Sequence, residues 1–197
     1  MKSPKNTPGE PAAHAVSTVA EQPARPAGTR RTLGIDPGTA RLGYAVIEEE
    51  RSKLTLLLGG VIETSKTLAM PERLLQLFHE LSSIVKDLQP TEMAVEELFF
   101  AKNTTTIISV GQARGIALLV AAEFGLTVHE YKPMQVKQAV HGYGLATKQQ
   151  VGEMVRILLA LPYALRPDDA SDAAAIAICH LHTLRVPGSH ASSPPLK

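Results

Sequence analysis

The sequence predicts one α/β domain in which helices cover both faces of a mixed five-stranded sheet. Three strand-like segments come first in the chain, and strand-like segments then alternate with helical ones. The helical segments carry apolar residues at intervals of three and four, whereas the strand-like segments are short apolar runs. The 197-residue chain is 44% hydrophobic and 20% charged, a composition typical of one globular domain with tails.

The first three strands are expected to form an antiparallel meander. TLGID at 32–36 is a short apolar run, and RLGYAVIEEE at 41–50 is a longer one. KLTLLLGGVIET follows at 53–64 after only Arg51 and Ser52, and so short a connection predicts that these strands are antiparallel neighbours.

The rest of the domain is expected to alternate between helices and strands. The apolar positions from Pro71 to Leu88 form the stripe of an amphipathic helix. Gly125 is expected to end the next helix, and Thr147 with Gln150 is a capping box that opens a later one. The expected segments are strands at 91–97 and 126–131 and helices at 71–88, 104–124, 133–141, 147–160 and 169–184.

Both ends of the chain are expected to be disordered tails around a folded domain at residues 32–185. Residues 1–31 contain five prolines and six alanines and carry a net charge of +3, and residues 186–197 are also of low complexity. The domain has 14 basic and 17 acidic side chains, a net charge of −3. If it binds nucleic acid, its acids must be clustered and neutralised by bound cations.

Several common features are missing from the sequence. No window approaches the roughly 18 apolar residues of a membrane span, and the N-terminus lacks the apolar core of a signal peptide. Cys179 is the only cysteine, so no intrachain disulfide can form. His180 and His182 are two residues apart on a predicted helix and do not face each other, which makes them a poor metal pair. We expect a cytoplasmic protein without membrane association.

Acidic residues stand where two strands of the predicted sheet end. Asp36 follows the first strand and precedes a Pro-Gly pair, so it is either a turn residue that bonds its own backbone or part of a site. Glu96 and Glu97 end the fourth strand. Alternation along a strand puts these two glutamates on opposite faces, and it does not show which of them faces a site.

A further set of acids opens the last predicted helix. Asp169 and Asp172 lie on one face of that helix, with Asp168 about 100° round from Asp169. Such aspartates can also serve only as helix caps. If the helix packs across the ends of neighbouring strands, four carboxylates converge, and divalent cations would relieve their repulsion. All-oxygen ligands favour Mg²⁺ or Mn²⁺, and two such ions can hydrolyse a phosphodiester.

Five segments of the chain resemble the RuvC family of Holliday-junction resolvases, which has an RNase H-like fold. They occur in the order of the family over residues 32–182, which is nearly the whole predicted domain. The segments are GIDPGTARLGYAVI, AVEELFFAKN, VGQARG, VKQAVHGYGLATKQQV and DASDAAAIAICHLH. The resemblance favours Glu96 over Glu97 and implies two Mg²⁺ ions per active site, with Mn²⁺ as a substitute. The catalytic and metal-binding acids that it implies are Asp36, Glu96, Asp169 and Asp172.

The expected DNA contacts lie in two other segments. In ELFFAKNTTT two phenylalanines stand beside Lys102, and aromatic side chains can stack on unpaired bases, although they also bury in cores. The resemblance implies that Phe99 inserts at the junction. It also implies that Lys137 and Lys148, which flank the glycine-rich HGYGLAT connector, contact the DNA backbone.

The resemblance implies an endonuclease that makes paired symmetric nicks in Holliday junctions during DNA recombination and repair, in the cytoplasm at the nucleoid. Cutting two strands related by a two-fold axis requires a homodimer. Gly111 and Gly115 in the 104–124 helix permit close approach, either to the sheet of the same domain or to another helix. The resemblance implies that this region helps to form the dimer. The expected partner is a branch-migration complex of the RuvA–RuvB type.

Three alternatives share parts of this pattern. Actin- and Hsp70-like ATPases also begin a strand with a motif like GIDPGT, but they need two such domains and a second phosphate loop. The YqgF-type nuclease starts with a similar glycine-rich strand, although FFAKN and VGQARG favour the RuvC family. A catalytically dead DNA-binding module is disfavoured because all four acids are present.

Overall fold

Five strands and five helices make up the part of the chain that the computed structural model describes, which is residues 28–97 and 104–185. In chain order they are β1 (Arg30–Asp36), β2 (Arg41–Glu50), β3 (Lys53–Glu63), α1 (Met70–Leu88), β4 (Glu92–Glu96), α2 (Thr104–Glu123), β5 (Thr127–Tyr131), α3 (Pro133–His141), α4 (Lys148–Leu158) and α5 (Asp168–Arg185). Every predicted element is present, with bounds within two residues of those expected. None of the helices in these ranges is long and apolar enough to cross a membrane.

The strands form one mixed sheet in the order β3-β2-β1-β4-β5. β1, β2 and β3 are antiparallel neighbours, and the turn between β2 and β3 has positive φ at Arg51 and Ser52. β4 pairs parallel with β1, and β5 pairs parallel with β4. The mixed five-stranded sheet with a three-strand meander is therefore confirmed.

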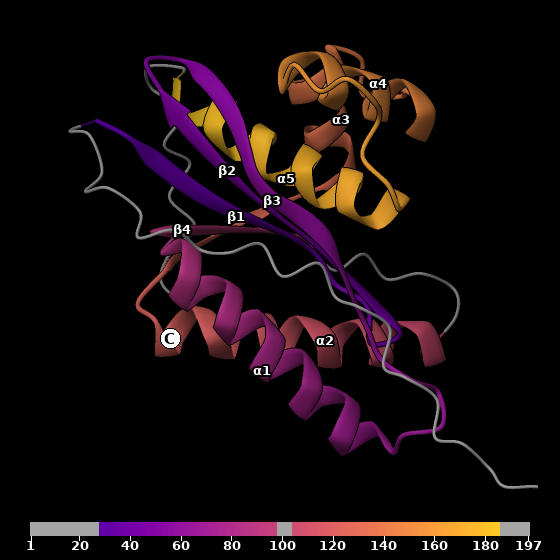
Figure 1. The fold of residues 1–197 in the computed structure, drawn as a ribbon. Coiled ribbons are helices and arrows are strands. Elements are labelled where there is room, and N and C mark those ends of the chain that lie inside the picture. The colour runs from indigo at the N-terminus through magenta and orange to yellow at the C-terminus, as the bar shows by residue number, and fades with distance from the viewer. Residues whose placement is uncertain (1–27, 98–103, 186–197) are drawn as a thin grey trace, which may run out of the picture.

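The helices cover both faces of the sheet (Figure 1). α1 and α2 pack on one face against large strand side chains such as Leu33, Ile35 and Val95. α5 lies on the other face, where the strands present small residues such as Ala45 and Ala94, and α3 and α4 pack against α5. Because side chains alternate along each strand, the two faces bury separate apolar clusters, and α5 can lie very close to its face.

Close contact between α5 and β1 depends on a glycine. A Cβ atom added at Gly34 would lie 2.0 Å from the backbone oxygen of Ala173 and 2.9 Å from the Cβ of Ala177. Any side chain at Gly34 would therefore push the helix away from the sheet. The absence of a side chain lets α5 cross the centre of the sheet with its alanine-rich surface in contact with the strand.

β1 begins two residues before the predicted strand, because Arg31 is buried in the sheet. Its Nε lies 2.6 Å from Glu48 Oε2, and its Nη1 donates to the carbonyl oxygen of Leu88 at 2.9 Å. Because its guanidinium group is paired and its aliphatic chain is buried, Arg31 belongs to the folded domain, although its charge resembles that of the preceding residues. The tail predicted at 1–31 therefore ends too late, since Arg30 and Arg31 belong to β1. Residues 1–27 of that tail, and the tail predicted at 186–197, lie outside the described residues.

Candidate active site

Two carboxylates end adjacent parallel strands on the same face of the sheet. Asp36 is the last residue of β1, and Glu96 is the last residue of β4. Because Ile35 pairs with Val95 in the parallel register, Asp36 and Glu96 occupy the next positions of the two strands. Ile35 and Val95 pack toward α1 and α2, so the two acids point to the opposite face, which α5 covers.

The first turns of α5 bring two more acids to this edge of the sheet. Gly43 pairs with Asp36 in the antiparallel register of β1 and β2. A Cβ atom at Gly43 would lie 2.2 Å from the backbone oxygen of Asp169, so the start of the helix rests directly on the β2 backbone. The predicted meeting of strand ends with a helix start is therefore present, and it places Asp169 and Asp172 beside Asp36.

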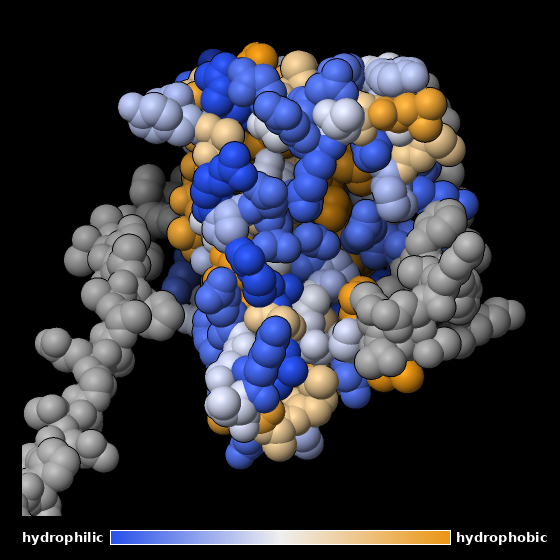
Figure 2. Space-filling model, turned by 90° about the vertical axis from the view of Figure 1, so that its right-hand side faces the viewer, coloured by the Kyte–Doolittle hydropathy of each residue, from blue (hydrophilic) through white to orange (hydrophobic). Residues whose placement is uncertain are grey.

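A cavity of about 270 Å³ lies between this sheet edge and the helices α3, α4 and α5. Asp36, Glu96 and Asp172 line it, together with Lys137 of α3 and Lys148 of α4. The remaining lining residues are apolar: Pro133, Val136, Val151, Ala175 and Ile176. The side of the molecule seen in Figure 2 is mostly hydrophilic, with a recess that has apolar side chains at its floor.

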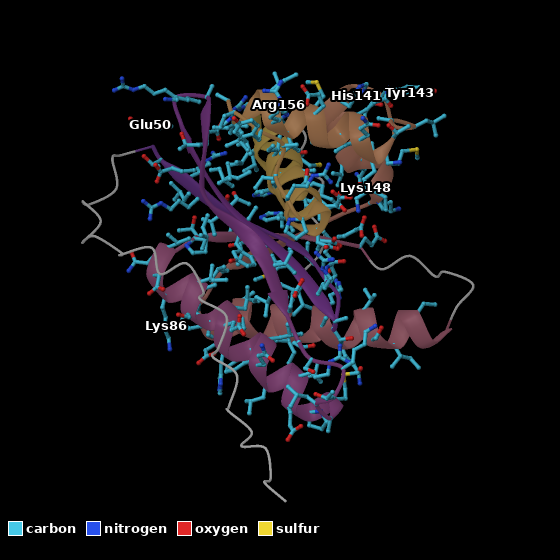
Figure 3. All side chains as sticks on the ribbon, turned by 45° about the vertical axis from the view of Figure 1, so that its right-hand side comes forward. Glu50, Lys86, His141, Tyr143, Lys148 and Arg156 are labelled. Carbon is cyan, nitrogen blue, oxygen red and sulfur yellow. The ribbon has the colours of Figure 1, made fainter. Side chains whose placement is uncertain are left out.

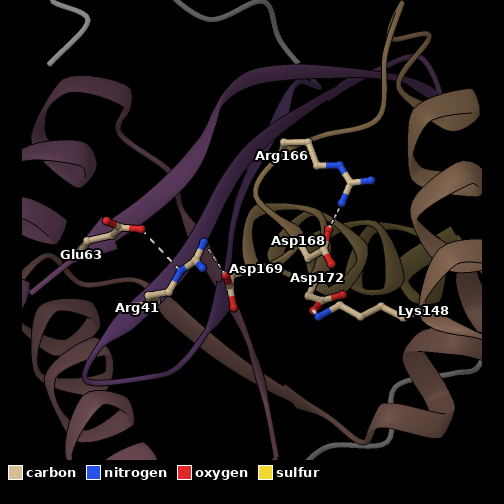
Figure 4. Close-up of polar contacts among 7 residues, drawn as sticks. All are labelled: Arg41, Glu63, Lys148, Arg166, Asp168, Asp169 and Asp172. Carbon is tan, nitrogen blue, oxygen red and sulfur yellow. Dashed lines mark hydrogen bonds and ion pairs between the residues drawn. The ribbon is translucent and has the colours of Figure 1, made fainter. Parts of the chain in front are cut away.

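The start of α4 positions Lys148. Thr147 Oγ1 accepts a hydrogen bond from the backbone N–H of Gln150, and Gln150 Oε1 accepts one from the backbone N–H of Thr147, which confirms the predicted capping box. Lys148 is the next residue (Figure 3), and its Nζ lies 2.7 Å from Asp172 Oδ2 (Figure 4). The lysine thus bridges α4 and the first turns of α5.

The other two aspartates of α5 pair with arginines and do not line the 270 Å³ cavity (Figure 4). Asp169 Oδ2 lies 3.0 Å from Arg41 Nη2, and Arg41 Nε lies 3.5 Å from Glu63 Oε1. Asp168 pairs with Arg166 on the opposite side. Asp169 is still close enough to Asp36 to raise its pKa.

The carboxylates in the cavity resist ionisation. Burial, followed by the charges of Asp172, Glu96 and Asp169, raises the pKa of Asp36 from 3.8 to about 7. Burial and the charge of Asp172 also raise the pKa of Glu96. Burial raises the pKa of Asp172 as well, and it outweighs the opposing hydrogen bond from Lys148. One lysine therefore does not compensate the negative charge that the fold gathers here.

The set of donor atoms fits a hard divalent cation. Asp36, Glu96 and Asp172 offer only carboxylate oxygens, which are the ligands that Mg²⁺ and Mn²⁺ prefer over nitrogen or sulfur. Because the pKa values of all three are raised, a bound cation would favour the ionised state of each carboxylate. Asp169 could join this set through Oδ1 while its Oδ2 keeps the contact with Arg41.

The structure brings five of the eight predicted site residues to one cavity: Asp36, Glu96, Asp172, Lys137 and Lys148. Asp169 lies beside it, and Phe99 and Lys102 lie outside the described residues. Glu97 does not line the cavity, and its backbone N–H donates to the carbonyl oxygen of Tyr131. Of the two glutamates that alternation alone left open, Glu96 is the one that faces the cavity.

Sequence reasoning missed a second polar cluster, formed by Glu92, His129 and His180. His180 was considered only with His182, and the structure agrees that those two histidines point to different partners. His182 Nδ1 contacts the carbonyl oxygen of Ala139, whereas His180 contacts side chains of β4 and β5. The members of the cluster lie far apart in the chain, so no local motif signals it.

The sequence comparisons find relatives over nearly all of the domain. A family model, crossover junction endodeoxyribonuclease RuvC, matches residues 32–180. A curated crossover junction endodeoxyribonuclease RuvC from Desulfitobacterium hafniense is 56% identical over 154 residues, which cover 78% of this chain and 93% of the relative. Another from Roseiflexus sp. is 55% identical over 152 residues, covering 77% and 90%.

Solved structures agree with the α/β architecture. Thermus thermophilus RuvC in complex with a Holliday junction substrate is 39% identical, with a TM-score of 0.76 over 79% of this chain and 95% of that one. The yeast mitochondrial Holliday junction resolvase Ydc2 is 16% identical, covers 78% and 79%, and shares the fold with a TM-score of 0.58. The RNase H-like fold expected from the sequence is thereby confirmed. The family match over most of the domain and the identity to curated relatives show that the chain belongs to the RuvC family of crossover junction endodeoxyribonucleases.

Proposed function

We propose that the protein is a structure-selective endonuclease that resolves Holliday junctions by paired symmetric nicks in DNA recombination and repair. One observation carries the proposal: three carboxylates and two lysines share one cavity in a domain that the RuvC family model spans. Carboxylates that hold divalent cations can support phosphodiester hydrolysis, and lysines beside them bind DNA phosphates. The Thermus thermophilus relative was solved with a junction substrate, which supports this substrate class.

The proposed cation ligands are Asp36, Glu96, Asp169 and Asp172, which would hold two Mg²⁺ ions, with Mn²⁺ as a substitute. When bound, such ions stabilise the charge that develops on the scissile phosphate and lower the pKa of an attacking water. The parallel strands hold Asp36 and Glu96 at fixed positions on one edge. Asp169 contacts Arg41 through Oδ2 at 3.0 Å, and its Oδ1 is the oxygen proposed to bind a cation while that contact persists. The chain's contribution is therefore to hold acids together that would otherwise repel.

The proposed DNA contacts lie beside the acids in the cavity. Lys137 and Lys148 project from α3 and α4, so a phosphate between these helices and the sheet edge would lie near both lysines and the carboxylates. Lys148 already neutralises part of the charge of Asp172. Phe99 and Lys102, which follow β4, are proposed as junction contacts on the strength of the family resemblance.

A homodimer is proposed because α2 has apolar residues on its outer surface. Ile108 and Leu119 are 63% and 54% exposed, and they lie on the same face of the helix, since eleven residues make about three turns. A Cβ atom at Gly115, on that face, would meet no neighbouring atom of the described chain. Leu75 of α1 is 55% exposed as well. Covering these side chains with a second copy would bury apolar surface and provide two active sites related by a two-fold axis.

The cellular context follows from the proposed substrate. A junction resolvase acts where DNA is recombined, so we propose a cytoplasmic, nucleoid-associated protein that works with a RuvA–RuvB-type branch-migration complex. We also propose that residues 32–185, together with the first two residues of β1, form the nuclease domain between two tails.

The test is cleavage of a synthetic four-way junction with and without Mg²⁺. The wild type should make paired nicks only with Mg²⁺, and Asp36→Asn should bind the junction without cutting it. Asp168→Asn is the matched control, because Asp168 is a neighbouring acid that pairs with Arg166 and does not line the 270 Å³ cavity. Full cleavage by Asp36→Asn, or equal loss of cleavage in both variants, would contradict the assignment.

A further inference from the structure

A second cluster of metal-ligating side chains lies on the α5 face of the sheet. Glu92 of β4, His129 of β5 and His180 of α5 each offer a ligand atom, and these atoms all lie within 4.8 Å of one another. His180 Nε2 lies 3.1 Å from Glu92 Oε2, and the ring centroids of His129 and His180 are 4.2 Å apart. His180 is fully buried, whereas Glu92 and His129 are partly exposed, so an ion could reach the cluster from solvent.

The cluster is separate from the acids of the nuclease cavity. Glu92 and Glu96 point to the same face of β4, but four residues of strand separate them by about 13 Å. Asp172 and His180 are eight residues apart on α5, a rise of about 12 Å. A cation bound by the cluster would therefore be distinct from the ions proposed for the cavity.

The ring of His129 lies beside that of His180, with 4.2 Å between the ring centroids, and a metal ion binds an imidazole through a ring nitrogen that carries no proton. Within residues 28–97 and 104–185 no hydrogen-bond partner contacts the ring of His129, so this imidazole has a lone pair to offer.

His180 is oriented by a hydroxyl group on its other nitrogen. Its Nδ1 lies 2.7 Å from the Tyr131 hydroxyl oxygen, and a histidine that binds a metal through one nitrogen is commonly held through the other. Without an ion, Nε2–H donates to Glu92 and the Tyr131 O–H donates to Nδ1. With an ion on Nε2, the proton would reside on Nδ1 and donate to the Tyr131 hydroxyl oxygen. His180 Nδ1 and the Tyr131 hydroxyl group therefore stay hydrogen-bonded with and without the ion, and His180 keeps its proton in both states.

We propose that Glu92, His129 and His180 form a zinc site that ties β4, β5 and α5 together. Two imidazoles and one carboxylate are a common ligand set for Zn²⁺, with a water as the fourth ligand, and they are a poor set for Mg²⁺. The three residues come from three different elements. A bound ion would therefore cross-link the sheet and the helix at a distance from the nuclease cavity.

A hydrogen-bond network without an ion is the competing explanation for these contacts. Tyr131, His180 and Glu92 would form such a network by themselves. His129 adds no hydrogen bond to it within the described ranges, yet its ring is held against His180. A site for an ion accounts for the placement of all three ligands.

The test uses the full chain with Asp36→Asn, which weakens the cavity as a competing site, in excess Mg²⁺. Co²⁺ is titrated as a coloured substitute for Zn²⁺, followed by visible absorption, and then displaced by Zn²⁺. We expect one ion per chain and a rise in Tm with Zn²⁺. His129→Phe, which keeps a ring at a partly exposed position, should abolish binding, and Tyr131→Phe should weaken it by about 10–100-fold. His79→Gln, an exposed histidine on α1, is the control and should bind as before.

Two results would overturn the zinc site. One is no Co²⁺ or Zn²⁺ binding by the folded Asp36→Asn protein. The other is binding of equal strength in His129→Phe and His79→Gln, which would place the ion elsewhere in the chain. Neither result depends on junction cleavage, so the zinc proposal and the nuclease proposal can fail independently.

Discussion

Replacing Asp36 by asparagine should stabilise the metal-free protein while it abolishes cleavage. Burial and three neighbouring acids raise the pKa of Asp36 from 3.8 to about 7 in the folded state. The folded state therefore binds a proton more tightly than the unfolded state, and the wild type loses stability as pH rises from about 3.8 to about 7. Asparagine has no charge to bury, and its amide can donate to Glu96 or Asp172, so the variant avoids this loss.

The size of the effect follows from the pKa shift. One pKa unit corresponds to about 1.4 kcal/mol, so the shift of Asp36 corresponds to at most about 4 kcal/mol above pH 7. The neighbouring carboxylates can take up protons in its place, which reduces the measurable gain to about 2 kcal/mol. For a domain of this size that gain should raise Tm by about 4–8 °C. At about pH 5 the folded wild type keeps its proton, so the gain should shrink by more than half.

The assay is thermal denaturation of both proteins in a chelating buffer, at about pH 5 and about pH 8, on either side of the folded pKa. Mg²⁺ should then stabilise the wild type more than the variant at the higher pH, because a cation relieves the repulsion that asparagine removes. A variant that is no more stable than the wild type in chelator at about pH 8 would refute the reasoning. A gain of equal size at both pH values would refute it as well.

Three other perturbations have distinct readouts. Gly43→Ala puts a Cβ 2.2 Å from the backbone oxygen of Asp169, so urea denaturation should show that the free energy of unfolding falls by about 1–3 kcal/mol, and cleavage should be reduced. Unchanged stability would contradict the close approach of α5. Lys148→Gln should weaken junction binding and lower the slope of log affinity against log salt by about one, as measured by fluorescence anisotropy; an unchanged slope would exclude a phosphate contact. Leu119→Asp, at a position that is 54% exposed, should give a monomer in sedimentation equilibrium with an unchanged circular dichroism spectrum; a persistent dimer would show that α2 is not the interface.

The elements of the fold were predictable because each has its own local signal. The capping box at Thr147 and Gln150 marks the start of α4, and the positive φ of Arg51 and Ser52 belongs to the short turn that the spacing of β2 and β3 required. Arg31 was assigned to the tail because its positive charge continues that of the tail. Its partner Glu48 lies on another strand, and no local pattern in the sequence reveals that pairing. The order of the strands and the face that each helix covers depend on packing between segments far apart in the chain.

The candidate site was predictable in composition but not in geometry. The residue types and their positions at strand and helix ends predicted a set of converging carboxylates, and three of them share the cavity. The pairing of Asp169 with Arg41 could not be foreseen, because the arginine lies on β2, far from α5 in the sequence, and the two meet where α5 rests on β2. The partner that orients the Asp169 carboxylate is therefore one that no local pattern contains.

The position of α5 determines both polar clusters. Gly34 and Gly43 let the helix lie directly on β1 and β2, and its N-terminal turns then meet the ends of β1 and β4. Further along the same helix, His180 reaches Glu92 at the start of β4 and stacks beside His129. Since Ala94 pairs with His129, the register of β4 and β5 puts that histidine on the α5 face. A displacement of α5 would therefore disturb the acidic edge and the histidine cluster together, whereas side-chain substitutions within either cluster should affect only that cluster.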